Sequence, residues 1–237
     1  MSNKIEVFDR ERSSNYDNKI KDLIPVYQNL LDKTVDFLTS SYSVEYDLKI
    51  LCVGCGTGTE IVRIAKISNN WKVYGCDPSI EMLNIAKEKI TASNLKNVEL
   101  KQGTVEVFKD HKFDVTNLSL VLHFFIKTDK YELLSKISEV LKLGGNLIIS
   151  DIYLANNFEQ KLNQLRLYIS KQNSIEMDNL NRYINHIRDD IKYISDKEIN
   201  EILNSLNFSK VNRTINKYVF GQWTSRFDGV KIDKITY

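Results

Sequence analysis

Residues 49–61, KILCVGCGTGTEI, place glycines at positions 54, 56 and 58 directly after a short apolar run. The apolar run predicts a buried strand, and TEIVRIAKI after it has the spacing of an amphipathic helix. Glycine allows the tight turn between the two and removes side chains that would keep a ligand from the backbone. The segment therefore predicts a strand, a bare loop and a helix, a unit typical of parallel α/β sheets.

The alternation of strand and helix signals continues as far as Tyr153. Further strands are predicted at WKVYGC, VELKQG, FDVTNLSL and GGNLIISDI, and helices at residues 77–90 and 131–143. In the first of these helices, Asp77 is expected near the N-cap and Pro78 at the first helical position. Strands that alternate with helices indicate a doubly wound, mostly parallel sheet that is covered on both faces.

The pattern changes after Tyr153. Two helical stripes with no strand between them predict a helical hairpin at residues 155–193, inserted over one end of the sheet. Ser195 and Glu198 then have capping-box spacing, and a helix and two strands follow. At the other end, residues 1–44 are expected to hold an N-terminal cap helix with Pro25 in its first turn. We expect one domain over residues 1–237 with a seven-stranded sheet.

Composition narrows the classes of function. The formal net charge is +2 and 42% of the residues are hydrophobic, so nothing global points to nucleic acid or an anionic membrane. The polar N-terminus lacks the pattern of a signal peptide, and no apolar run approaches the roughly 20 residues of a membrane span. Three cysteines without a secretory signal favour a cytoplasmic protein. Cys52 and Cys55 flank a strand end, so no metal or redox site is expected.

Two ligand classes compete for the glycine loop. In a doubly wound sheet, ligands bind beyond the carboxyl ends of the strands. The dinucleotide pattern G-x-G-x-x-G does not match, because Thr59 occupies the third glycine slot, and no lysine makes a phosphate loop. Asp77 ends the second strand and can accept both hydroxyl protons of a ribose. The loop and Asp77 together predict a nucleoside site, with or without phosphates.

Five segments, taken in order, resemble the class I S-adenosylmethionine-dependent methyltransferases. ILCVGCGTG is similar to their first motif, VYGCDPSIEML to their second, and VELKQGTVEVF to the segment that wraps the adenine. FDVTNLSLVLHFF resembles the strand that passes the reactive methyl, and LKLGGNLIISD the fifth-strand motif. The resemblance covers about residues 16–223. It implies a Rossmann-like methyltransferase fold that transfers a methyl group from S-adenosyl-L-methionine to a small-molecule acceptor and releases S-adenosyl-L-homocysteine.

The resemblance also implies roles for individual residues. The loop from Gly54 through Cys55 and Gly56 to Gly58 would let the backbone approach the methionine part of the cofactor. Asp77 would hold the ribose hydroxyls. The other implied contacts are Pro78 and Met82 beside the adenine, Thr104 and Val105 at its edge, Leu118 and Ser119 near the sulfonium, and Tyr16 and Tyr27 closing over the cofactor.

Two positions depart from the family pattern. Cys52 stands where an Asp or Glu usually helps to place the cofactor's ammonium group, and Thr104 where an Asp often contacts the adenine amino group. Each loss removes a charge-assisted hydrogen bond worth roughly 1.5–3 kcal/mol. Either the affinity for the cofactor is modest or other groups compensate. The same departures leave open a catalytically silent, methyltransferase-like binding protein.

His123, just after the fourth strand, is the candidate catalytic base, and a histidine packed at the top of the sheet is the alternative. Methyl transfer is an in-line displacement that depends mainly on proximity and alignment, so a base is needed only where the acceptor keeps its proton. Asp151 and Tyr153 end the fifth strand and are candidates for substrate contacts. His111 and His186 are expected at the surface.

A narrower resemblance concerns the ends of the chain. FDRERSSNYDNKIKDLIPVYQNLL and KYVFGQW are similar to carboxy-S-adenosylmethionine synthases and their relatives connected with tRNA wobble-uridine modification. This resemblance implies that a basic residue of the inserted helices binds a carboxylated cofactor, here Arg182 or Arg188. The hairpin and the N-terminal helix are rich in Tyr, Ile, Leu and Asn, which suits a small, partly apolar acceptor better than an RNA backbone. The oligomeric state, a homodimer included, stays open.

Overall fold

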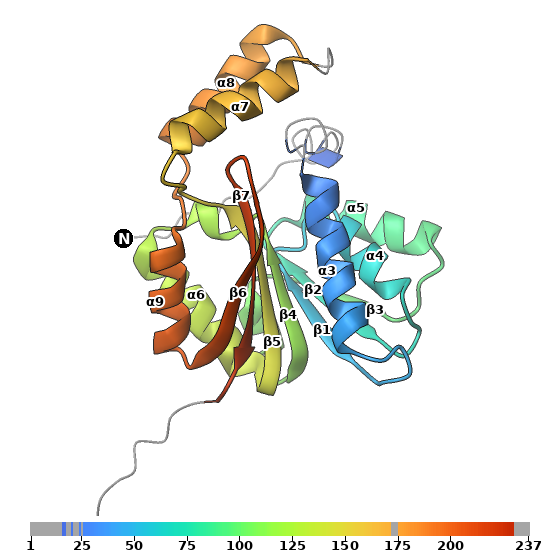
Figure 1. Ribbon diagram of the computed structural model, residues 1–237. Helices are drawn as coiled ribbons and strands as arrows, with labels where there is room; N and C mark the ends of the chain where they lie inside the picture. The colour runs from blue at the N-terminus through green and yellow to red at the C-terminus, as the bar shows by residue number, and fades with distance from the viewer. Residues whose placement is uncertain (1–15, 18–19, 21–23, 25, 172–174, 230–237) are drawn as a thin grey trace, which may run out of the picture.

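The computed structural model describes residues 16–17, 20, 24, 26–171 and 175–229 as a sheet with helices on both faces (Figure 1). The strands are β1 (Lys49–Val53), β2 (Lys72–Asp77), β3 (Val98–Gln102), β4 (Phe113–Ser119), β5 (Leu141–Ile152), β6 (Phe208–Lys217) and β7 (Phe220–Phe227). The helices are α3 (Tyr27–Ser41), α4 (Thr59–Ala65), α5 (Ile80–Ala92), α6 (Lys127–Val140), α7 (Phe158–Ser170), α8 (Met177–Asp189) and α9 (Asp196–Ser205).

The seven strands lie in the order β3-β2-β1-β4-β5-β7-β6. Strands β1 to β5 pair in parallel, whereas β7 runs antiparallel to both β5 and β6. This order confirms the doubly wound, mostly parallel seven-stranded sheet. The order of the strands reverses between β1 and β4, which is where a crevice opens beyond the carboxyl ends of such a sheet.

The residues of β1 alternate between two cores, because successive side chains of a strand point to opposite faces. Ile50 and Cys52 pack toward α3 and α4 on one face. Leu51 and Val53 pack on the other face, in the core that α6 and α9 cover. All four are buried. A central strand with helices on both sides has no polar face, so KILCV is nearly continuous in apolar residues.

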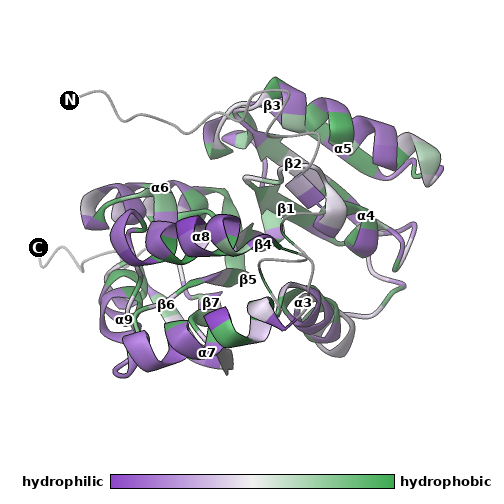
Figure 2. Cartoon of the chain, turned by 90° about the horizontal axis from the view of Figure 1, so that it is seen from above, coloured by the Kyte–Doolittle hydropathy of each residue, from purple (hydrophilic) through white to green (hydrophobic). Residues whose placement is uncertain are grey.

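The inserted hairpin predicted after the fifth strand is present as α7 and α8, which project beyond the sheet (Figure 1). Leu165 of α7 and Ile184 of α8 form a third core with Leu30 of α3 and with Phe220, next to the turn between β6 and β7. Figure 2, which looks down on the hairpin, shows mainly hydrophilic residues on the outer side of α8. The hairpin therefore buries its apolar stripes at the edge where the parallel strands end.

The start of α5 differs from the prediction. Its N-cap is Ser79, whose Oγ accepts a hydrogen bond from the Met82 backbone at 3.3 Å, so Asp77 and Pro78 both precede the helix. The capping-box spacing after the hairpin is confirmed, because Ser195 Oγ accepts from the Glu198 backbone at 3.1 Å at the start of α9. Pro25, expected in the first turn of the N-terminal helix, lies outside the described residues.

Candidate cofactor and active site

A cavity of ≈ 260 Å³ opens at the carboxyl ends of β1, β2 and β4, next to the point at which the strand order reverses. Its inner wall comes from the ends of these strands and from the segment after β3. Its outer part is lined by side chains from the loop before α6 and from α6 itself. The inner wall contains Val53, Gly54, Gly56, Asp77, Pro78, Met82, Gly103, Thr104, Val105, Glu106, Ser119, Leu120 and Val121.

At Gly54 and Gly56 the glycine loop lines the cavity with backbone that carries no side chain. Gly54 has φ +65°, and a Cβ there would lie 2.6 Å from Val121 Cγ2, so only glycine fits. Gly58 has φ +74°, and its Cβ would lie 2.7 Å from Ala86 Cβ on α5. Gly58 therefore serves the contact between the loop and α5 and does not line the cavity, whereas Gly56 does.

Asp77 is held by the backbone on two sides. One carboxylate oxygen accepts from the Gly56 backbone at 2.9 Å and the other from the Ser79 backbone at 2.8 Å. Burial raises the pKa of Asp77, and these two hydrogen bonds partly oppose the shift. A carboxylate offers about four acceptor positions, so two hydrogen bonds leave acceptors for donors within the cavity. A pair of ribose hydroxyls is such a set of donors.

Tyr16 and Asp17, called the strap below, lie beside the glycine loop. Tyr16 lines the cavity, and burial raises the pKa of its phenol. Asp17 accepts from Thr57 Oγ1 at 2.5 Å and from Thr59 Oγ1 at 3.2 Å, and it forms an ion pair with Lys89 of α5. Burial raises the pKa of Asp17, but Lys89 and the two hydroxyls lower it below its usual value overall. Asp17 therefore ties the strap to the glycine loop and to α5.

His123, which is partly buried, and Asp151, which is fully buried, form a pair next to the cavity. Asp151 Oδ1 lies 2.7 Å from His123 Nδ1, and Oδ2 accepts from the Val121 and Leu122 backbone at 3.1 and 2.7 Å. A neutral imidazole whose Nδ1 donates to a carboxylate keeps Nε2 free to accept a proton. His123 does not line the cavity, but Phe124, whose ring centroid lies 4.1 Å from that of His123, does.

The structure brings together most of the residues that the sequence singled out, namely Tyr16, Gly54, Gly56, Asp77, Pro78, Met82, Thr104, Val105 and Ser119. Cys55, Gly58, Leu118, Tyr27 and His123 lie outside the wall. Leu118 is fully buried, because it points to the opposite face of β4 from Ser119. Cys55 packs toward Gly75 of β2, where its Sγ would lie 3.0 Å from an added Cβ.

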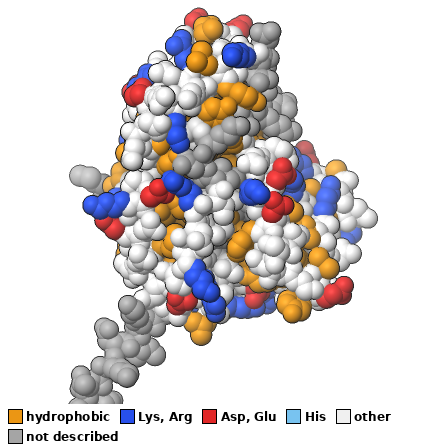
Figure 3. Space-filling view, in the orientation of Figure 1, with side chains coloured by type: hydrophobic (Ala, Val, Ile, Leu, Met, Phe, Trp, Pro, Cys, Tyr) orange, Lys and Arg blue, Asp and Glu red, His pale blue; other side chains and the backbone are white. Residues whose placement is uncertain are grey.

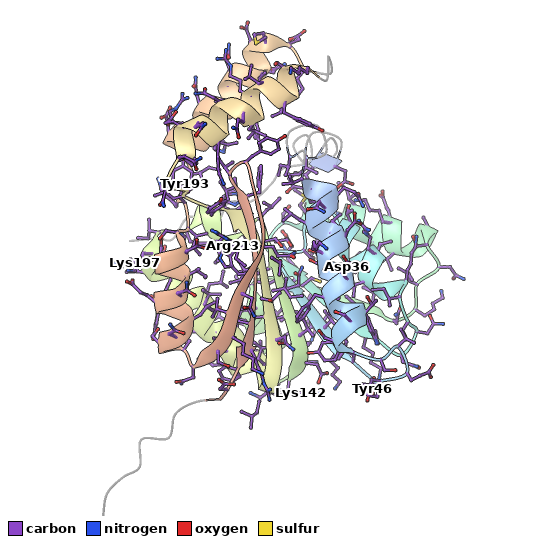
Figure 4. All side chains as sticks on the ribbon, in the orientation of Figure 1. Asp36, Tyr46, Lys142, Tyr193, Lys197 and Arg213 are labelled. Carbon is purple, nitrogen blue, oxygen red and sulfur yellow. The ribbon has the colours of Figure 1, made fainter. Side chains whose placement is uncertain are left out.

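Two expected substrate contacts are wrong. Asp151 is fully buried and holds the segment after β4, and Tyr153 is 2% exposed. The Tyr153 hydroxyl accepts from Lys161 at 2.6 Å, and the Arg213 guanidinium lies 5.2 Å over its ring. Figure 4 labels Arg213 on β6, where it also pairs with Asp196 of α9. Tyr153 is therefore a core residue under this ion pair.

Of the two histidines expected at the surface, one is placed there. His186 is exposed and lies 2.8 Å from Asp190, four residues along α8. His111 is only partly exposed and stacks on Phe113, with ring centroids 6.1 Å apart, in a cluster with Tyr74 and Phe108. The expectation for His111 is therefore wrong, because an imidazole can pack as an aromatic ring.

Sequence reasoning missed the outer part of the cavity. Phe125, Asp129, Glu132, Leu133 and Lys136 line it beside Phe124. Lys136 pairs with Glu106 at 3.0 Å, and Glu106 accepts from Thr104 Oγ1 at 3.0 Å. The carboxylate absent from position 104 is thus present two residues later. Only the doubled phenylalanine in VLHFF could have signalled this wall.

The three cysteines are free thiols, Cys52 and Cys76 buried and Cys55 partly so. Burial raises the pKa of Cys76 to about 12 and that of Cys52 well above its ordinary value, so these thiols stay protonated at neutral pH. Within the described residues, no group of three or more His, Cys, Asp or Glu side chains could hold a metal ion. No helix in the same part of the chain has both the length and the apolar character to cross a membrane.

A family model described as a methyltransferase domain matches residues 45–207, which contain the glycine loop, Asp77 and the end of β4. The chain belongs to the class I S-adenosylmethionine-dependent methyltransferase family. The match includes α7 and α8 as well as β1 to β5. The match therefore includes the hairpin and all of the cavity lining except Tyr16.

Curated relatives of this methyltransferase domain include carboxy-S-adenosyl-L-methionine synthases. That of Colwellia psychrerythraea is 28% identical over 147 residues, which are 61% of this chain and 59% of the relative. That of Nautilia profundicola is 29% identical over 163 residues, 68% of this chain and 67% of the relative. The alignments thus span between 59% and 67% of the length of these two proteins.

Solved structures share the fold at lower identity. The magnesium protoporphyrin IX methyltransferase of Synechocystis PCC 6803, with bound SAH, has a TM-score of 0.66 and 17% identity, and the match covers 92% of this chain and 97% of that one. A SAM-dependent methyltransferase from Aquifex aeolicus has a TM-score of 0.61 and 18% identity, with 93% and 99% covered. Both confirm the methyltransferase fold.

Proposed function

We propose that the chain transfers the methyl group of S-adenosyl-L-methionine to a small-molecule acceptor. The observation that carries the proposal is a single cavity in which the glycine loop, the partly free acceptors of Asp77 and the end of β4 face one another. Gly54 leaves room that a Cβ would fill, and Asp77 keeps acceptors for two hydroxyls. These features suit an adenosyl ligand that presents its sugar to Asp77.

The bound cofactor would supply an electrophilic methyl group on a sulfonium. The residues of this chain have to bind and align, which contributes up to roughly 7–11 kcal/mol in favourable cases. The glycine loop and Asp77 fix the ligand, and the Tyr16 strap covers it. For an acceptor that keeps its proton, His123 remains the candidate base although it lies outside the cavity wall, and Asp151 accepts its Nδ1–H and so leaves Nε2 free for the proton.

The acceptor that suits the outer cavity is small and partly apolar. Phe124, Phe125 and Leu133 bring apolar side chains there, and Asp129 and Glu132 add carboxylates. On the face drawn in Figure 3, acidic and basic side chains are interspersed, which does not favour binding to a nucleic-acid backbone. The free thiols support a reducing, cytoplasmic setting.

Thermal unfolding with S-adenosyl-L-homocysteine tests the proposal. A ligand that binds only the folded state raises the melting temperature with the logarithm of its concentration, and we expect such a rise for this chain. The control is adenosine 5′-monophosphate, which carries the same ribose but a phosphate that the glycine loop has no lysine to neutralise. No rise at millimolar S-adenosyl-L-homocysteine would favour the catalytically silent alternative.

A second candidate is a carboxy-S-adenosylmethionine synthase-like activity, favoured by the carboxy-S-adenosyl-L-methionine synthases among the curated relatives. It requires a cation for the extra carboxylate. Arg182 bonds to Asn179 at 2.5 Å and Arg188 pairs with Glu159 at 3.4 Å, and neither lines the cavity. Mass spectrometry of the nucleoside that co-purifies with the chain distinguishes the two, because a carboxylated cofactor would replace methyl transfer as the better proposal.

A further inference from the structure

Glu60 is an acid in the first turn of α4 whose carboxylate lies among polar groups of β4 and α3. Its Oε1 accepts from Ser119 Oγ at 3.2 Å, and Asn117 Nδ2 in turn donates to Ser119 Oγ at 3.5 Å. Among the described residues it has no ion pair, because Arg63, one turn further along α4, pairs with Asp32 instead. Withdrawing a carboxylate from water without a cation is costly, so its retention here requires a reason.

The hydrogen bonds around Glu60 are short of donors. An ionised carboxylate only accepts, so Ser119 must give its single hydroxyl proton to Glu60. The Ser119 oxygen accepts from Asn117 Nδ2 at 3.5 Å and keeps one further lone pair as an acceptor, and Ser119 lines the cavity. Asn117, which is 1% exposed, has an Oδ1 atom with no hydrogen-bond partner. A ligand group that reaches this end of the cavity is therefore matched best if it donates hydrogen bonds and carries positive charge.

Cys52 lies in register with Asn117 on the neighbouring strand. Burial, followed by the nearby Glu60, raises the pKa of the Cys52 thiol, so that thiol adds no second negative charge. One carboxylate thus supplies the negative charge of this cluster, and it comes from α4 rather than from β1. A further acid at position 52 would be repelled by Glu60.

We propose that Glu60, acting through the Ser119 hydroxyl, is the positioning residue for the ammonium group of the ligand's amino-acid part. The inference rests on the proposed function, because it assumes an adenosyl ligand whose methionine end faces Ser119. It assigns to this chain a replacement for the acid that is absent at Cys52. The nucleoside part of the ligand makes no demand on Glu60, because Asp77 lies at a different strand end.

Two ligands separate this role from a merely structural one. S-adenosyl-L-homocysteine carries the ammonium group, whereas 5′-methylthioadenosine has the same nucleoside and thioether without it. In isothermal titration, E60Q should bind S-adenosyl-L-homocysteine about 10- to 100-fold more weakly than the wild type, with 5′-methylthioadenosine bound within about twofold. E45Q, at an exposed glutamate before β1, should bind both like the wild type.

Thermal unfolding without ligand adds an independent readout. Because Gln removes a poorly compensated charge and keeps the shape, ligand-free E60Q should melt at or above the temperature of the wild type. An equal loss of affinity for both ligands, an unchanged affinity for S-adenosyl-L-homocysteine, or a lower melting temperature would each overturn the role of Glu60. A wild type that binds neither ligand would instead overturn the proposed function, and the role of Glu60 with it.

Discussion

Two strands of the sheet have an aspartate at or next to their carboxyl end, and the two carboxylates have different roles. Asp77 ends β2, accepts two backbone hydrogen bonds and still faces the cavity. Asp151, next to the end of β5, accepts from the Val121, Leu122 and Ile152 backbone and from His123, and none of its surface is exposed. The first is positioned to bind a ligand, and the second holds a loop and a histidine in place.

The difference comes from the segments that surround each strand end. After β2 the chain turns directly into α5 with Ser79 as its N-cap, so Asp77 stays open on one side. At β5 the segment after β4 folds across the carboxylate and uses its acceptors. The same residue type at a similar place in a strand thus becomes a binding group or a structural group according to how many of its acceptors the backbone occupies.

The largest effect is expected from D151A. Loss of the Asp151 carboxylate leaves the Val121 and Leu122 backbone N–H groups and His123 Nδ1 without an acceptor in the protein interior. Each unsatisfied buried donor costs about 1–3 kcal/mol, so we expect the free energy of unfolding to fall by about 3–5 kcal/mol. Denaturant unfolding measures this. Stability within about 1 kcal/mol of the wild type would contradict the structural role of Asp151.

D77N should weaken ligand binding and leave the stability nearly unchanged, whereas D151A should mainly lower the stability. Removal of a buried charge and the imperfect fit of an amide to two backbone donors oppose each other, so the free energy of unfolding should stay within about 1 kcal/mol of the wild type. Affinity for S-adenosyl-L-homocysteine should fall by about 10- to 100-fold, as expected for a lost charge-assisted hydrogen bond. Calorimetric titration measures the affinity. If D77N bound the ligand normally, the two aspartates would not differ as described.

K89M tests the binding side of the comparison, because it removes the ion pair that holds Asp17 of the strap beside the glycine loop. The ion pair of Lys89 with Asp17 is about one-quarter exposed, so solvent screens it and we expect a loss of about 1 kcal/mol in ligand binding, or roughly fivefold. Wild-type affinity should fall as salt is added, while that of K89M should change less. K87M, at an exposed position of the same helix, is the matched control. Equal salt dependence in K87M and K89M would count against the strap.

The smallest effect concerns pH. Burial raises the pKa of Glu60 in the folded chain above its ordinary 4.5, so the folded state holds this proton more tightly than the unfolded state. The free energy of unfolding of the wild type should therefore fall as the pH rises from about 4.5 through the raised folded pKa. E60Q lacks this contribution, so its advantage over the wild type should grow with pH. Denaturant titrations at several pH values measure this difference in the free energy of unfolding. If the difference between E60Q and the wild type stayed constant with pH, the raised pKa of Glu60 would be contradicted.

Local signals in the sequence predicted much of the fold and the ligand side of the cavity. The apolar run before Gly54 and the acid that ends β2 depend only on neighbours in the chain, so their positions follow from pattern and spacing. The sequence did not determine which residue is the N-cap of α5, because Asp77 and Ser79 are both good N-cap residues and Pro78 is compatible with either. The Gly56 backbone, distant in sequence, decides between them by engaging Asp77.

Contacts between distant segments could not be predicted. Asp17 meets Lys89, and Glu106 meets Lys136, only after the helices have packed. The burial of Asp151 depends on the path of the segment after β4, which no residue pattern specifies. The expected placement of side chains at the strand ends therefore agrees with the structure where a local turn sets their direction, as at Asp77, and differs where another loop covers the side chain, as at Asp151.

The position of β7 in the sheet has a consequence for synthesis. Residues 220–227 lie between β5 and β6 and supply the neighbour that β6 pairs with. A nascent chain that has not yet released this segment from the ribosome leaves one side of β5 with unmet backbone hydrogen bonds, an edge prone to non-native pairing. The strand that completes the architecture is thus added after every ligand-facing residue described above has already emerged.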